Sequence, residues 1–126
     1  MSVGTADTTV VWDWVNAAAT AAEEGPGADT IIIDVGDVLV ITDHFVITSG
    51  ANTRAVRALA DRIEEAVDDC GGPKPICIEG LSDYEWVLMD YGDFVVHIFT
   101  ASARDYYSLD QLWKDCPTLA ANPLPS

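Results

Sequence analysis

The chain has 126 residues, 49% of them hydrophobic, which is enough for one compact core and too little for two ordinary domains. A formal net charge of −15 argues against a basic nucleic-acid groove, and every apolar stretch is shorter than the roughly 20 residues that cross a bilayer. The first residues lack the basic start and the cleavage site of a secretory signal, so we expect a cytoplasmic protein.

The first half of the chain predicts two helices and two strands. Apolar residues recur at helical spacing over Thr8–Glu24, and glycines follow at once. Thr30–Val35 and His44–Ser49 are rich in β-branched residues and nearly all apolar, as strands covered on both faces are. Asn52 can cap a second helix. Its buried side is expected to consist of Val56, Leu59, Ala60, Ile63 and Val67.

The second half predicts three strands and a last helix. Pro75–Glu79 is the third strand, while 86–90 and 94–99 are joined so closely by Tyr91 and Gly92 that they form an antiparallel hairpin. Ser102 is expected to cap a helix on which three large apolar residues share a face; these are Tyr106, Leu109 and Trp113.

These elements predict a single α/β domain with a mixed five-stranded sheet flanked by helices. We divide it into an N-terminal helix and linker (1–27), the α/β domain (28–116) and a flexible, proline-punctuated C-terminal tail (117–126). Three cysteines without C-x-x-C spacing predict neither a disulfide framework nor a zinc site, and favour reduced, partly buried thiols.

Carboxylates raise the possibility of catalysis. Asp34 with Asp37, and Asp90 with Asp93, resemble the paired aspartates that hold Mg²⁺ for phosphoryl or nucleotidyl transfer. The usual pattern is D-x-D, in which alternate side chains of a strand point the same way. Both pairs here are D-x-x-D, so their side chains point to opposite faces of an extended chain. A magnesium-dependent enzyme therefore stays an alternative, and His97 inside a strand is favoured as a structural residue over a general base.

Aromatic residues raise a second possibility. Six tryptophans and tyrosines are interleaved with acids in the last third of the chain. Along 86–90, Trp86, Leu88 and Asp90 share one face, and Val87 and Met89 share the other with Tyr91. An aromatic anchor beside an acid is typical of a binding hot spot for a basic partner, although the rings can also fill the core. An acidic surface that only maintains solubility, and an acidic adaptor for another basic protein, remain open.

Two stretches resemble a known family. "DVGDVLVITDHFVITSGANTRAVRALADRIEE" (34–65) is similar to the first half of the ribosomal silencing factor family, also called the Iojap family. "EGLSDYEWVLMDYGDFVVHIFTASARDYYSLDQLW" (79–113) resembles its second half, with W-V-L-x-D-Y-G-D, V-H, R-x-x-Y and a closing L-W. The match covers about Ala28 to Trp113, while the first 25 residues match little.

The resemblance implies a domain related in shape to nucleotidyltransferases without their catalytic motif, and it implies neither an enzyme nor a cofactor. Such a protein would be a translation repressor that binds ribosomal protein fourteen of the large ribosomal subunit and blocks joining with the small subunit, with little direct nucleic-acid contact. The family also implies a possible homodimer. The partner-binding residues carried over by motif are Trp86, Leu88, Asp90, Tyr91, Asp93, Arg104 and Tyr107. For Arg104 and Tyr107, an intramolecular ion pair or a dimer contact stays equally open.

Overall fold

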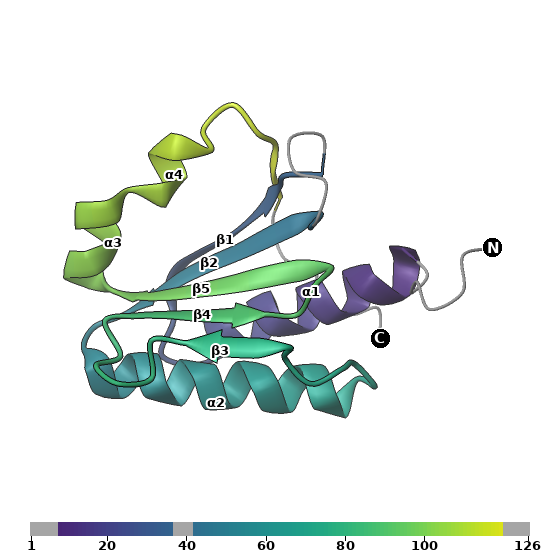
Figure 1. The fold of residues 1–126 in the computed structure, drawn as a ribbon, viewed down its shortest axis with the longest axis horizontal. Coiled ribbons are helices and arrows are strands. Elements are labelled where there is room, and N and C mark those ends of the chain that lie inside the picture. The colour runs from purple at the N-terminus through teal and green to yellow at the C-terminus, as the bar shows by residue number, and fades with distance from the viewer. Residues whose placement is uncertain (1–7, 37–41, 120–126) are drawn as a thin grey trace.

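The computed structural model describes residues 8–36 and 42–119, which form one mixed sheet with helices on both faces (Figure 1). Within these residues the sheet has six strands in the order β3-β4-β5-β2-β1-β6. None of the described helices combines the length and apolarity needed to cross a membrane. The elements in chain order are α1 (Thr8–Glu24), β1 (Ala28–Asp34), β2 (His44–Gly50), α2 (Thr53–Asp69), β3 (Cys77–Glu79), β4 (Trp86–Asp90), β5 (Phe94–Thr100), α3 (Ala101–Tyr107), α4 (Leu109–Leu112) and β6 (Thr118–Leu119).

The centre of the sheet is a parallel pair, β2 and β5, and the other strand pairs are antiparallel. This confirms the predicted mixed sheet and the hairpin of β4 and β5. The prediction of five strands was wrong, because Thr118 and Leu119 form β6 by pairing with β1. A strand of two residues carries no alternation pattern, so only its partner in the fold identifies it. β6 lies inside the segment predicted to be a tail, whose residues 120–126 lie outside the described ranges.

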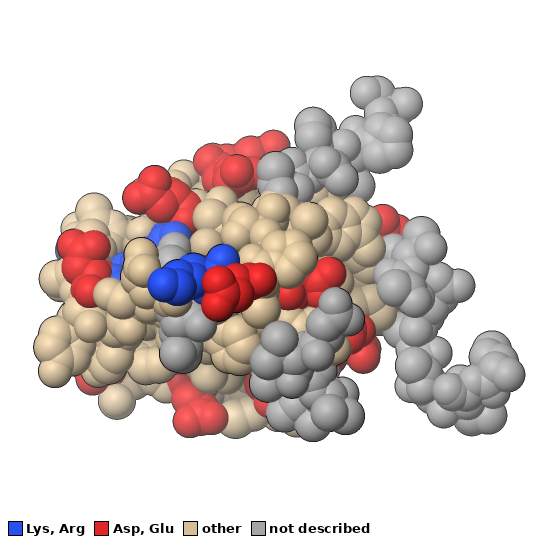
Figure 2. All heavy atoms as spheres, turned by 90° about the horizontal axis from the view of Figure 1, so that it is seen from above, with Lys and Arg blue, Asp and Glu red and all other residues tan. Residues whose placement is uncertain are grey.

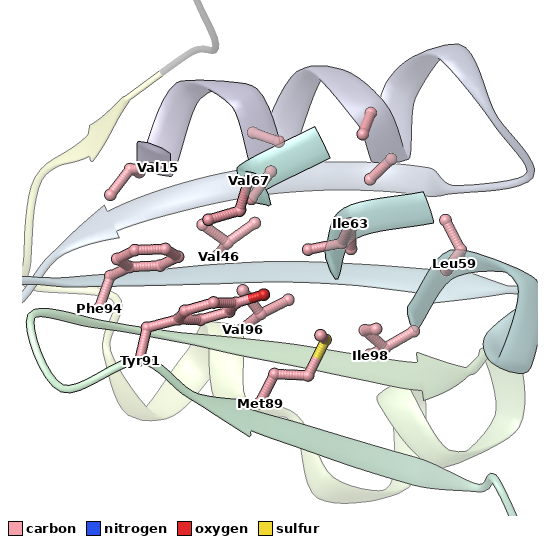
Figure 3. Close-up of a cluster of buried hydrophobic side chains, with 14 of the residues drawn as sticks. Val15, Val46, Leu59, Ile63, Val67, Met89, Tyr91, Phe94, Val96 and Ile98 are labelled. Atoms are coloured by element: carbon pink, nitrogen blue, oxygen red, sulfur yellow. The ribbon is translucent and has the colours of Figure 1, made fainter. Parts of the chain in front are cut away.

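The larger core lies between the sheet and the two long helices, α1 and α2 (Figure 3). The sheet contributes Val46, Val96 and Ile98, each fully buried, and each such side chain stabilises the fold by about 1.5–3 kcal/mol. This face of the sheet is filled, so α1 and α2 leave it no room for a partner. The predicted buried side of α2 is confirmed, with Val56, Leu59, Ala60, Ile63 and Val67 in the core. The apolar residues at helical spacing in α1 are buried as well: Val11, Val15, Ala18, Ala19 and Ala22.

A smaller core lies on the opposite face, under α3 and α4. Its buried members come from β1, β2, β5 and α3, and from Val35, which directly follows β1. Leu109 and Trp113 pack against them. The buried members are Ile33, Val35, Phe45, Ile47, Phe99 and Ala103. Because β3 and β4 contribute no buried member to this core, the side chains that they direct to this face remain partly exposed.

The chain after β5 differs from the prediction. Thr100, and not Ser102, caps α3, since its Oγ1 accepts a hydrogen bond from the Ala103 N–H at 3.2 Å. Ser108 then adopts a left-handed conformation (φ 51°) and separates α3 from α4. This break interrupts the helical period, so Tyr106 is 81% exposed and does not share the buried side of Leu109 and Trp113. The expectation of one common face was therefore wrong.

Candidate partner-binding site

β4 presents alternate side chains to opposite faces of the sheet, as predicted. Val87 and Met89 are fully buried against the helices, whereas Trp86, Leu88 and Asp90 are half-buried on the other face. Strand pairing places Glu79 and His97 on either side of Leu88, and Cys77 and Val95 on either side of Asp90. We call this surface the β3–β5 face; it consists of the outward side chains of Cys77, Glu79, Trp86, Leu88, Asp90 and Val95 above a buried floor of His97 and Phe99.

Trp86 is held by contacts on several sides. Its indole Nε1–H donates a hydrogen bond to His97 Nδ1 at 3.2 Å. Its ring centroid lies 4.9 Å from that of Phe99 in the neighbouring strand and 4.7 Å from that of Tyr107 in α3. The remaining exposed part of the indole lies on the β3–β5 face, so Trp86 is a rigid, half-buried aromatic group of the kind found at binding hot spots.

Two tyrosines of α3 extend this aromatic surface outwards. Tyr107 is 49% exposed and Tyr106 is 81% exposed, and their rings meet edge to face at 5.0 Å. The motif comparison identified Tyr107, but Tyr106 was missed because helical spacing assigned it to the core. Because the two exposed rings lie together, they extend one apolar patch, the kind of surface that marks interaction sites. No clear local signal marked the end of α3, so the sequence did not reveal this exposure.

Acidic side chains surround the apolar floor near Trp86. A hollow of about 360 Å³ is lined by Trp86, Leu88 and Tyr107 together with Glu79, Gly80, Ser82, Asp83 and Glu85. Glu85 is tied to the start of α3, because its Oε1 accepts a hydrogen bond from Thr100 Oγ1 at 3.2 Å. Figure 2 views the molecule from the side of α3 and α4 and shows many more acidic than basic side chains. Such a surface favours a basic partner.

The acids of the hairpin partly serve the turn itself. Asp90 Oδ1 accepts a hydrogen bond from the Gly92 N–H at 2.8 Å, and Gly92 has φ 86°, a conformation that glycine adopts without steric cost. The backbone carbonyl of Asp93 accepts a hydrogen bond from the Asp43 N–H at 3.0 Å. Asp90 therefore contributes charge to the β3–β5 face while it stabilises the turn, and Asp93 is half-buried just beyond it.

Tyr91 lies on the opposite face from Trp86. It is 4% exposed, its ring stacks on Phe94 at 4.6 Å, and burial raises the pKa of its phenol well above the usual value. Figure 3 shows its hydroxyl directed among the core side chains, and among the described residues that oxygen has no hydrogen-bond partner. A buried ring cannot contact a partner directly, so Tyr91 supports the hairpin from below.

Arg104 connects α3 to the start of β1. Its Nη1 donates hydrogen bonds to the carbonyl oxygens of Asp29 at 2.6 Å and Ala28 at 3.3 Å. Asp29 has a left-handed backbone (φ 51°), which the guanidinium contact helps to hold. Arg104 thus acts as an intramolecular brace for the helix that carries Tyr107, through backbone carbonyls.

The aspartates considered for a magnesium site have structural contacts or lie outside the described residues. No three His, Cys, Asp or Glu side chains of residues 8–36 and 42–119 form a group that can hold a metal. Asp34 Oδ1 accepts a hydrogen bond from Gly36 N–H at 3.1 Å, and Asp37 lies outside the described residues. The turn before α2 is a helix cap, since Asn52 Oδ1 accepts from Ala55 N–H at 2.9 Å. Of the three cysteines predicted to be reduced and partly buried, Cys116 is free and partly buried, whereas Cys70 and Cys77 are free but exposed.

Comparison with known proteins identifies one family throughout. The family model described as "Ribosomal silencing factor during starvation" matches residues 9–126. The ribosomal silencing factor RsfS of Bacillus subtilis is 35% identical over 100 residues, which are 79% of this chain and 84% of the relative. The mouse protein named "Mitochondrial assembly of ribosomal large subunit protein 1" is 31% identical over 87 residues, 68% of this chain and 38% of that protein.

A solved structure shares the fold as well. The crystal structure of a protein from Chromobacterium violaceum superposes with a TM-score of 0.75 at 30% identity, over 90% of this chain and 88% of that one. The family match begins at residue 9, so it includes α1, whose sequence had suggested little resemblance.

Proposed function

Because this chain belongs to the ribosomal silencing factor family, which acts on the ribosome, we propose that it binds the large ribosomal subunit through ribosomal protein fourteen and blocks joining with the small subunit. It does so as a translation repressor without catalysing a reaction. The observation that carries the proposal is a half-buried tryptophan on the β3–β5 face, where the helices leave the sheet uncovered, flanked by acids and lying beside the exposed tyrosine pair of α3.

Charge supports a ribosomal protein as the direct partner. Ribosomal proteins are basic, and a chain with a net charge of −15 is attracted to them and repelled by the phosphates of RNA. The two effects together confine contact to a patch where basic protein is exposed on the intersubunit side. Opposite potentials fix the partner and its orientation more than they raise affinity, so the affinity has to come from the aromatic contacts.

The residues carried over from the family motif have three proposed roles: apolar contact, charge and support. Trp86, Leu88 and Tyr107 supply apolar contact, while Asp90 and Asp93 supply charge at the edge of the same surface. Tyr91 and Arg104 act from within, by supporting the hairpin and by holding α3. We add Tyr106 to the proposed contact surface because its side chain is 81% exposed.

Steric exclusion is sufficient as a mechanism. A domain of this length has a radius of gyration of about 14 Å, and a rigid body of that size on the intersubunit face keeps the small subunit away without any chemistry. Ribosomes work in the cytoplasm, so the proposal includes a cytoplasmic location. The homodimer remains a prediction, which light scattering of the free protein tests directly.

The proposal is tested by co-sedimentation with isolated large subunits at moderate salt, followed by a subunit-joining assay. We expect wild-type protein to sediment with large subunits and to reduce joining. Trp86→Ala is expected to weaken binding by about 30-fold or more, the effect of a lost hot-spot residue. Trp14→Ala is the matched control, because Trp14 is also a half-buried tryptophan but packs in α1 beside the other core.

Two results contradict the proposal: wild-type protein that does not sediment with large subunits, or Trp86→Ala protein that binds as well as wild type while its thermal unfolding shows it folded. Nucleotide turnover that is lost on Asp34→Asn or Asp90→Asn would instead favour the magnesium-dependent enzyme. Recovery of one basic protein in the absence of ribosomes would favour an acidic adaptor.

A further inference from the structure

His97 occupies the floor of the β3–β5 face. It lies in the middle of β5, paired with Leu88 of β4 on one side and Ile47 of β2 on the other, and is only 5% exposed. Its ring meets Phe45 edge to face at 4.8 Å and lies nearly parallel to Phe99 at 6.3 Å. The imidazole is therefore fixed by packing on both sides.

The contact with Trp86 defines the state of this histidine. An indole N–H is only a donor, so His97 Nδ1 accepts the 3.2 Å hydrogen bond and the ring proton is assigned to Nε2. Burial lowers the pKa of His97 to about 4, which keeps the ring neutral near neutral pH. Only this neutral form can accept from Trp86.

The same burial makes histidine an expensive choice at this position. Nε2 is buried, and it has no hydrogen-bond partner among the described residues. An unmade hydrogen bond costs free energy, whereas an apolar ring of similar shape would avoid that cost. An apolar ring, however, has no atom that accepts the hydrogen bond from the Trp86 indole N–H.

We propose that His97 is a positioning residue that fixes the orientation of the Trp86 indole and so prepares the β3–β5 face for its partner. The expected effect on binding rests on the proposed function, since it assumes that Trp86 contacts the partner. A side chain that is already ordered loses less freedom on binding. Without the acceptor, the indole has to be ordered during association, and we expect affinity for large subunits to fall about three- to tenfold.

Two substitutions separate positioning from packing. His97→Phe keeps a flat ring of similar volume and removes the acceptor. His97→Asn keeps an acceptor near the place of Nδ1, although its side chain is smaller. The first readout is the indole N–H signal of Trp86 in a ¹H–¹⁵N spectrum, assigned by its loss in Trp86→Phe. We expect His97→Phe to move that signal and to speed its exchange with water, and His97→Asn to retain the wild-type behaviour.

Binding supplies the second readout. We expect His97→Phe to weaken co-sedimentation although its stability to urea is equal to or above that of wild type, and His97→Asn to restore binding. If His97 acts through Trp86, adding His97→Phe to Trp86→Ala changes binding no further, because coupled residues are not additive.

The inference is overturned if the Trp86 signal of His97→Phe matches wild type, or if His97→Phe binds as tightly as wild type. It is also overturned if the two substitutions weaken binding additively. Failure of the proposed function is a different result: wild-type protein then does not bind large subunits, while the indole signal still decides whether His97 orients Trp86.

Discussion

The buried His97 makes the stability of the protein depend on pH in a defined window. Its pKa falls from 6.5 in an exposed histidine to about 4, because burial disfavours the charged ring. Between these two values the unfolded chain binds a proton that the folded protein does not. The free energy of unfolding therefore falls as the pH falls from 6.5 to about 4.

The size of this effect follows from the proton affinities of His97 in the unfolded and folded states. They differ by a factor of roughly 300, which corresponds to about 3 kcal/mol of stability. Above pH 6.5 the ring is neutral in both states, and the histidine contributes no pH dependence. Below about pH 4 it is protonated in both states and the full loss has occurred. For a domain whose total stability is about 5–15 kcal/mol, this loss is a large share.

Urea unfolding followed by circular dichroism measures this contribution, at several pH values from about 4 to 8. Wild type is compared with His97→Asn, which cannot titrate at this position. Carboxylates change the baseline in both proteins alike, so the difference between the two curves isolates the histidine. We expect wild type to lose about 3 kcal/mol more than the variant on going from neutral pH to about pH 4. Parallel curves over that range would refute the argument.

Four further substitutions test particular positions by urea unfolding. Gly80→Ala is expected to cost about 2 kcal/mol or more, because φ is 89° and a Cβ would meet the carbonyl oxygen at the start of β4, whereas Gly71→Ala, with φ 85° and open space, should cost about 1 kcal/mol. Tyr91→Phe should leave stability unchanged or raise it by about 1 kcal/mol, since its hydroxyl is buried with no hydrogen-bond partner in the described part of the chain, and a loss above 2 kcal/mol would contradict this. Thr100→Val should cost about 1–2 kcal/mol and weaken binding to large subunits, since it removes the α3 cap and the hydrogen bond to Glu85 just before β4; unchanged stability would show that the cap is dispensable.

The sequence predicted most of the fold because its local patterns agree with the packing. The helical spacing of α1 and α2 marks the same residues that are buried, and the alternation of β4 assigns Trp86 and Val87 to the correct faces. In the second D-x-x-D pair, Asp90 closes the hairpin turn by accepting a hydrogen bond from the Gly92 N–H. Each of these features is decided by neighbours along the chain, which a single sequence displays.

The missed features depend on residues far apart in the chain. β6 exists through its pairing with Ile32 and Ile33, and its own two residues carry no strand pattern. The end of α3 is set by Ser108, which is not a glycine, so the change in direction that exposes Tyr106 had no clear local signal. The hydrogen bond from Trp86 to His97 joins adjacent strands. Sequence spacing does not tell that His97 Nδ1 accepts it, or that Nε2 has no partner among the described residues.

In the proposed complex with the large subunit, charge and direct contact act over different ranges, so each has its own part in binding. At physiological salt, exposed charges are screened beyond about 8 Å, so the acids of this chain act on a ribosome only as it comes close. Near RNA they repel, and near a basic protein they attract, so they select the place of contact. Once contact is made, charged pairs at a wet rim add little. In the proposed complex the binding energy is therefore expected from the aromatic surface of Trp86 and Tyr107, and a preformed indole would supply it at a small entropic cost.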